Sequence, residues 1–183
     1  RDIFVLRELG GVYIALEKYE EAWQVIEEIE RLDRHAFERN AECAALRGKW
    51  LRKSNDPNKA TEVYERALRH NPKSYYLATL AAEASLEANN NDSAIKHYTR
   101  SLEIIEELNE SNIWAWASAA IASLATSEIE RAKKFALLIS VESPSREELN
   151  TIEGGLRLVQ DRLDVSNEDF DMVLGIVRGA ATR

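Results

Sequence analysis

Small and apolar residues return along the chain at a nearly constant interval. Ala60 and Ala94 are 34 residues apart, and a further 38 residues in either direction lead to Ala22 and Ala132. Each of these alanines lies twelve residues after another small residue, namely Gly10, Gly48, Ala82 and Ala120. Two antiparallel helices that cross at small side chains explain this spacing, because a larger side chain at the crossing pushes the helices apart. The pattern therefore predicts repeated pairs of short helices.

Four such units are expected within residues 1–146, at 3–36, 41–74, 75–108 and 113–146. Their helices are predicted at 3–16, 19–33, 38–53, 57–70, 73–89, 92–108, 111–125 and 128–140. A single helix pair cannot bury its apolar face, so neighbouring pairs stack. The predicted fold class is an all-α, right-handed solenoid.

The last segment, 147–183, contains two more amphipathic patterns, at 146–163 and 167–178. Ser145 and Glu148 have the spacing of a capping box at the start of the first helix. Solenoids need terminal elements that cover the last exposed core, so both helices are expected to cap or pack on the array. The second helix is apolar enough that lying in the groove or meeting a partner remains an alternative.

The units resemble the tetratricopeptide repeat (TPR), whose pattern places Leu, Gly and Tyr on the first helix and Ala on the second. Unit 3–36 is the most similar, and it carries Leu6, Leu9, Gly10, Tyr13, Ala22 and Ile26. A finer similarity, in "NPKSYYLATLAAEASL" and "NIWAWASAAIASL", is to the TPR-like TRAF-binding region of apoptosis signal-regulating kinases and bacterial proteins. Both resemblances imply a protein-binding segment, in the finer case a regulatory one beside an effector domain.

Composition narrows the class of protein further. The formal net charge of −8 argues against a nucleic-acid partner, because phosphate binding relies on clustered Lys and Arg. A lone cysteine, Cys43, gives no disulfide framework, and this favours a reducing, cytoplasmic setting. No run of about 18 apolar residues is present, so no membrane span is expected. The chain opens without Met and already in pattern, as a piece of a longer protein does.

Residues that carry catalysis or bind metal are not grouped in the sequence. The histidines, His35, His70 and His97, have no Cys, Asp or Glu neighbours at metal-ligand spacing, and His70 and His97 are expected to be solvated. Glu-rich runs such as "EEIE" fit solvated helix faces better than acid/base pairs. We therefore predict no enzymatic activity, no cofactor and no metal.

The inner face of the first helices is the predicted binding surface. It contributes a basic stretch, Lys49, Arg52 and Lys53, beside an aromatic and apolar one. That second stretch, with the other residues of the third and fourth units on this face, consists of Tyr76, Thr79, Glu83, Leu86, Trp114, Ala117, Ile121 and Leu124. The second unit also places Glu42 and Ala45 on this face. Acidic and hydrophobic residues of a peptide or helix suit this surface. Two simpler interpretations stay open: the aromatic residues pack between repeats, and the cations are solvated.

Two functions follow from this surface. The first is a non-catalytic module that binds a partner protein or peptide in the concave groove. The alternative is a structural scaffold that forms a homo-oligomer or packs against an effector domain of the same chain. Neither involves nucleic acid or a membrane.

Overall fold

The computed structural model describes residues 2–179, and eleven α-helices lie within this part of the chain. They are α1 (Ile3–Ala15), α2 (Tyr19–Leu32), α3 (Ala36–Arg39), α4 (Ala41–Lys53), α5 (Pro57–His70), α6 (Tyr75–Glu87), α7 (Asn91–Leu108), α8 (Ile113–Ala125), α9 (Ile129–Val141), α10 (Arg146–Arg162) and α11 (Asn167–Val177). The all-α fold of helical repeats is thus confirmed. Helix ends differ from the predicted ones by at most three residues, and only the short α3 was not predicted.

Side-chain caps explain the largest of these differences, where helices begin later than expected. Asn40 adopts an extended backbone, and its Oδ1 accepts hydrogen bonds from the backbone N–H groups of Glu42 and Cys43 at 2.9 and 3.1 Å. Ser74 and Asn112 cap α6 and α8 in the same way. Each cap satisfies N–H groups that a helix start leaves without partners, so the helix begins one residue beyond it.

The turns within the four helix pairs share one backbone conformation. Glu17, Asn55, Asn89 and Ser127 all have a left-handed backbone, with φ between 58° and 64°. The next residue after each one donates its N–H to a carbonyl five residues back, at 2.8–2.9 Å. These four residues are separated by 38, 34 and 38 positions, as the alanines are. The geometry therefore repeats with the interval seen in the sequence.

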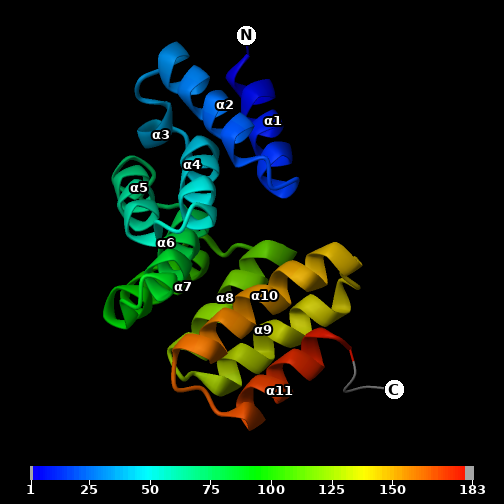
Figure 1. Ribbon diagram of the computed structural model, residues 1–183. Helices are drawn as coiled ribbons and strands as arrows, with labels where there is room; N and C mark the ends of the chain where they lie inside the picture. The colour runs from blue at the N-terminus through cyan, green and yellow to red at the C-terminus, as the bar shows by residue number, and fades with distance from the viewer. Residues whose placement is uncertain (1, 180–183) are drawn as a thin grey trace.

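The helix pairs follow one another along the array, from α1 and α2 at one end to α8 and α9 near the other (Figure 1). Within the second pair, Gly48 lies under the ring of Tyr64, so that a Cβ on Gly48 would stand 2.2 Å from Tyr64 Cζ. Tyr64 is fully buried, as is Tyr98, its counterpart in the third pair. The small residue thus makes room for a large ring as well as for the crossing itself.

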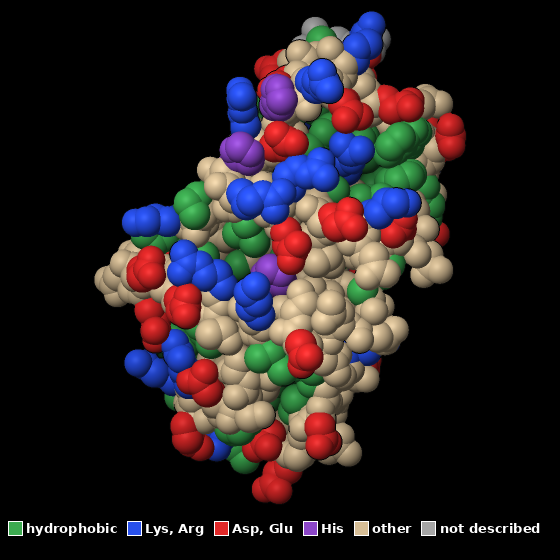
Figure 2. All heavy atoms as spheres, turned by 90° about the vertical axis from the view of Figure 1, so that its left-hand side faces the viewer, with side chains coloured by type: hydrophobic (Ala, Val, Ile, Leu, Met, Phe, Trp, Pro, Cys, Tyr) green, Lys and Arg blue, Asp and Glu red, His purple; other side chains and the backbone are tan. Residues whose placement is uncertain are grey.

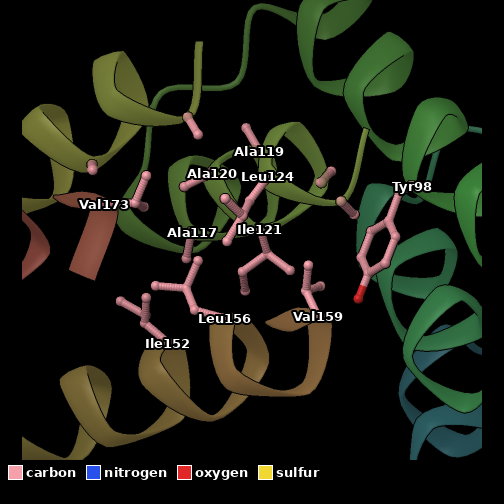
Figure 3. Packing of buried hydrophobic residues seen from close by; sticks show 14 of the residues in the cluster. Tyr98, Ala117, Ala119, Ala120, Ile121, Leu124, Ile152, Leu156, Val159 and Val173 are labelled. Atoms are coloured by element: carbon pink, nitrogen blue, oxygen red, sulfur yellow. The ribbon is translucent and has the colours of Figure 1, made fainter. Parts of the chain in front are cut away.

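The two C-terminal helices pack on different sides of the array. α11 packs against α9 and α10, and it buries Phe170, Val173, Leu174 and Val177. α10 instead lies along α8 and α6, which are first helices and form the concave side. In Figure 3, Ile152, Leu156 and Val159 of α10 point toward Ala117 and Ile121 of α8. It is therefore α10, and not 167–178, that occupies part of the groove.

Candidate functional site in the concave groove

A hollow of about 900 Å³ opens on the concave side between α4, α6, α8 and α10. All seven residues proposed from the sequence as partner-binding line it: Lys49, Arg52, Lys53, Tyr76, Glu83, Trp114 and Ile121. They come from three first helices, which the solenoid places side by side. We call this feature the concave hollow. The structure brings the seven residues together, but their accessibility and charge pairing differ.

Tyr76 and Trp114 are the exposed aromatic side chains of the hollow. Their exposed fractions are 40% and 44%, so neither is a core residue between repeats. They occupy the second position of the third and fourth units and therefore lie on the same face of consecutive first helices. Partial burial, with the nearby carboxylates of Glu42 and Glu83, raises the pKa of Tyr76 to about 12. The phenol thus stays neutral at physiological pH and can donate a hydrogen bond.

Arg52 differs from the two lysines of the predicted basic stretch, because it is paired with carboxylates. Its guanidinium forms a bidentate pair with Glu87, at 2.7 and 2.8 Å, and donates to Glu83 at 2.8 Å. Burial disfavours the charged form of Arg52, but the hydrogen bond with Glu87 and the charges of both carboxylates outweigh it, so its pKa lies above the ordinary value. The first helix α6 supplies both carboxylates, one turn apart. Arg52 therefore joins α4 to α6.

Two buried phenols lie behind this ion cluster. The hydroxyls of Tyr64 and Tyr98 have no hydrogen-bond partner among the residues the structure describes. Burial raises the pKa of both, and the charges of Arg52 and Glu83 act on each with opposite signs. Both side chains are completely buried, so neither hydroxyl is available to a ligand in the hollow.

The lysines of the hollow are free to meet a partner. Lys49 and Lys53 are exposed, and neither has an ion pair within residues 2–179. Lys73, in the turn before α6, lines the same hollow and is also exposed. Residues 34–73 contain ten Lys or Arg and five Asp or Glu, whereas the whole chain is acidic. The outer face of the molecule also shows a row of Lys and Arg side chains across its upper part (Figure 2).

Glu83 and Ile121 have structural contacts that the sequence did not reveal. The carboxylate of Glu83 forms an ion pair with Arg52. Ile121 is only 5% exposed, because α10 covers it: a Cβ on Gly155 would lie 2.5 Å from Ile121 Cδ1. Leu86 and Leu124, also expected on the inner face, are completely buried. Ile121 is therefore corrected from a contact residue to a core residue at the base of the hollow.

Sequence reasoning missed several residues that line the hollow: Lys73, Glu87, Glu110, Thr151 and Ile152. Glu87 occupies the same position in the third unit as Lys53 in the second, so the repeat alone could have placed Glu87 on the inner face. Lys73 and Glu110 lie in turns; Lys73 was expected within helix 73–89, but neither residue is at an inward-facing repeat position that the prediction used. Thr151 and Ile152 belong to α10, and its return over the concave side depends on tertiary packing.

Side chains that could bind a metal ion are not clustered in the described part of the chain. Residues 2–179 hold no group of three or more His, Cys, Asp and Glu that is placed to bind a metal ion. His97 of α7, expected to be solvated, is only 8% exposed, and its Nε2 lies 3.0 Å from Oε1 of Glu65 in α5. Among the described helices, none combines the length and apolar character needed to cross a bilayer.

Comparison with known proteins agrees with this architecture. Residues 51–104, from the end of α4 into α7, match the family model described as tetratricopeptide repeat. A comparison with curated protein sequences found no significant match. Among solved structures, PilW, described as a widely conserved type IV pilus biogenesis factor, is similar at a TM-score of 0.58 and 15% identity, over 98% of this chain and 87% of PilW.

MamA protein is similar at a TM-score of 0.54 and 15% identity, over 98% of this chain and 93% of MamA. At such identities the likeness concerns the fold. The finer similarity to the TRAF-binding region stays a prediction. Residues 51–104 thus match a tetratricopeptide repeat, and the described chain shares the helical-repeat fold of these structures, in agreement with the spacing of the units.

Proposed function

We propose that this chain is a non-catalytic interaction module that binds a peptide or helix of a partner protein in the concave hollow. One observation carries the proposal: Tyr76 and Trp114 remain 40% and 44% exposed on the wall of a hollow of about 900 Å³. Aromatic side chains of this kind bury large areas with little loss of rotamer freedom, so they are frequent anchors in interfaces. Exposed aromatics within a hollow favour an occupant.

The charges around these aromatics define the occupant's chemistry. Lys49, Lys53 and Lys73 are unpaired within residues 2–179, while the carboxylates of Glu83 and Glu87 are held by Arg52. Glu42 and Glu110 also line the hollow, so its charge is mixed, and the three unpaired lysines are the groups that can meet acidic side chains. A segment with an apolar side chain for Tyr76 and Trp114 and acidic side chains for the lysines fits both features. The proposed site thus keeps Lys49, Lys53, Tyr76 and Trp114 and adds Lys73.

Site-specific photo-crosslinking tests this proposal. A photoreactive phenylalanine analogue replaces Trp114 in the hollow or, as a matched control, Leu137 on α9, which is similarly exposed at 48%. We expect the analogue at position 114 to form a defined adduct with a protein or peptide, and the analogue at position 137 to form none. Adducts at 137 alone contradict the proposal and favour the scaffold alternative, in which an outer face packs on another domain.

A further inference from the structure

A second apolar surface lies at the end of the array that α1 forms. Val5, Leu9, Val12 and Leu16 follow one another at helical spacing, and their exposed fractions are 59%, 38%, 53% and 60%. They form one stripe along α1 and its C-terminal cap, Leu16, and no helix within residues 2–179 covers it. We call this stripe, with the groove that it forms against α2, the α1 face.

Equivalent positions in other units show what kind of element packs on such a stripe. Val5, Leu9 and Val12 occupy the third, seventh and tenth positions of their unit. The residues at these positions in the third unit are Leu77, Ala81 and Ala84, and in the fourth unit Ala115, Ala119 and Ala122; all six have an exposed fraction of 0%. The second helix of the preceding unit packs against each of these first helices: α5 against α6, and α7 against α8. The α1 face therefore continues an interface that occurs twice inside the array.

The groove beside the stripe is apolar with an acidic rim. Its volume is about 520 Å³, and Val5, Leu6, Leu9 and Val25 line it together with carboxylates, among them Asp2 and Glu21. No Lys or Arg of the described chain lines it. Residues 2–33 as a whole carry nine Asp or Glu and three Lys or Arg. The local field therefore favours cations at the edge of an apolar contact.

We infer that the α1 face binds an amphipathic α-helix from another protein, with a stripe of small and apolar residues and a flank of Lys or Arg. The helical shape follows from the α5–α6 and α7–α8 contacts, and the basic flank follows from charge complementarity. Symmetric pairing of two copies through this face would place two acidic ends together, so a second copy fits less well. This surface is separate from the concave hollow, and either one can bind without the other.

A designed peptide tests the inference on the whole 183-residue chain. The probe is a fluorescent 18-residue helix with Ala and Leu on one face and Lys elsewhere, and its twin carries Glu in place of Lys. Fluorescence anisotropy is expected to show the Lys peptide binding at least about tenfold more tightly than the Glu twin at low salt. Equal binding of the two peptides overturns the charge argument.

Three matched substitutions locate the binding surface. Val5→Asn and Val12→Asn remove apolar contact from the α1 face, and Val141→Asn does the same on α9, where Val141 is 78% exposed. Val and Asn have similar helix propensities, so the helices are expected to persist, as circular dichroism will check. Each α1-face variant should weaken the Lys peptide by at least about fivefold, and Val141→Asn should leave its affinity unchanged.

Equal affinities for all three variants and the unsubstituted chain overturn the proposal, since the peptide then binds by charge alone. Sedimentation velocity tests whether a second copy of the chain occupies the α1 face. If the unsubstituted chain self-associates and both Val5→Asn and Val12→Asn abolish that association, the face binds a second copy, and the proposed partner is wrong. A monomer with peptide binding that depends on Val5 and Val12 supports the proposal.

Discussion

The ring of Tyr64 lies over Gly48 so closely that Tyr64 Cζ would stand 2.2 Å from any Cβ at that position. Tyr64 is completely buried and cannot move away without opening the α4–α5 pair. We therefore expect Gly48→Ala to lower the free energy of unfolding by about 1–3 kcal/mol through overpacking. Chemical denaturation measures the change.

Gly154 provides the matched control for Gly48. It also lies inside a helix, but nothing stands within 4 Å of a Cβ built there. Gly154→Ala is expected to stabilise the protein by about 0.5–1 kcal/mol, because Ala has the higher helix propensity. If the two substitutions have the same sign of effect, the assigned contact between Gly48 and Tyr64 is wrong.

The left-handed turn residues predict a stabilising substitution at Glu17. Three of the four equivalent turns hold Asn or Ser, but the first holds Glu17, with φ of 59°. A side chain with Cβ is strained there by about 1–2 kcal/mol, whereas Asn tolerates the conformation better. Glu17→Asn should therefore raise the melting temperature, while Asn89→Glu at the equivalent turn should lower it. A lower melting temperature for Glu17→Asn together with a higher one for Asn89→Glu would contradict the prediction.

Arg52 and Lys49 lie one turn apart on α4 and are expected to respond differently to charge reversal. Arg52→Glu leaves Glu83 and Glu87 without their cation in a partly buried cluster, and we expect a loss of about 1–3 kcal/mol in stability. Lys49→Glu changes an exposed residue with no ion pair in the described chain, and its effect should stay within about 0.5 kcal/mol. Equal melting curves for the two variants would contradict the bridging role of Arg52.

The contact between α10 and α11 is expected to weaken in acid. Arg178 donates to both carboxylate oxygens of Glu153 at 2.6 Å, and this bond, followed by the one from Arg157, holds the pKa of Glu153 below its ordinary value. A depressed pKa in the folded state stabilises the fold above the ordinary Glu pKa of about 4.3, and the contribution is lost as the pH falls through the folded value.

Glu153→Gln should therefore melt below the unsubstituted chain at pH 7, and the difference should disappear near about pH 3. Glu147→Gln, on the same helix but without an ion pair in residues 2–179, serves as the control and should melt like the unsubstituted chain at both values. A difference for Glu153→Gln that persists in acid would mean that packing, not charge, is affected.

The repeated positions of Gly48, Ala60 and Ala94 made the helix pairs predictable, because crossings and turns are local features with a fixed spacing. The position of α10 was not predictable in this way. Its amphipathic stripe predicts a helix with a buried face, but several surfaces could bury it, and the contact of Gly155 with Ile121 decides among them only in three dimensions.

The pairing of charges in the hollow was also not predictable from the sequence. Arg52, Lys49 and Lys53 look alike in the sequence as cations on one helix face. Only the structure shows that Glu83 and Glu87 approach Arg52 alone. The spacing of these residues within α4 is enough to predict that they share one face of the helix. Their ion pairing with carboxylates of α6 is not predictable in this way, because it depends on the angle and offset between two helices.

The most direct test of the proposed function compares binding and melting for a partner identified by crosslinking at position 114. Lys49→Glu with Lys53→Glu should slow association, and the loss should shrink at high salt, because screened charges steer less. Trp114→Ala should speed dissociation at every salt concentration. Both variants should melt close to the unsubstituted chain, since all three side chains are exposed. If both remain folded and bind the partner with unchanged rates, the concave hollow is not the binding site.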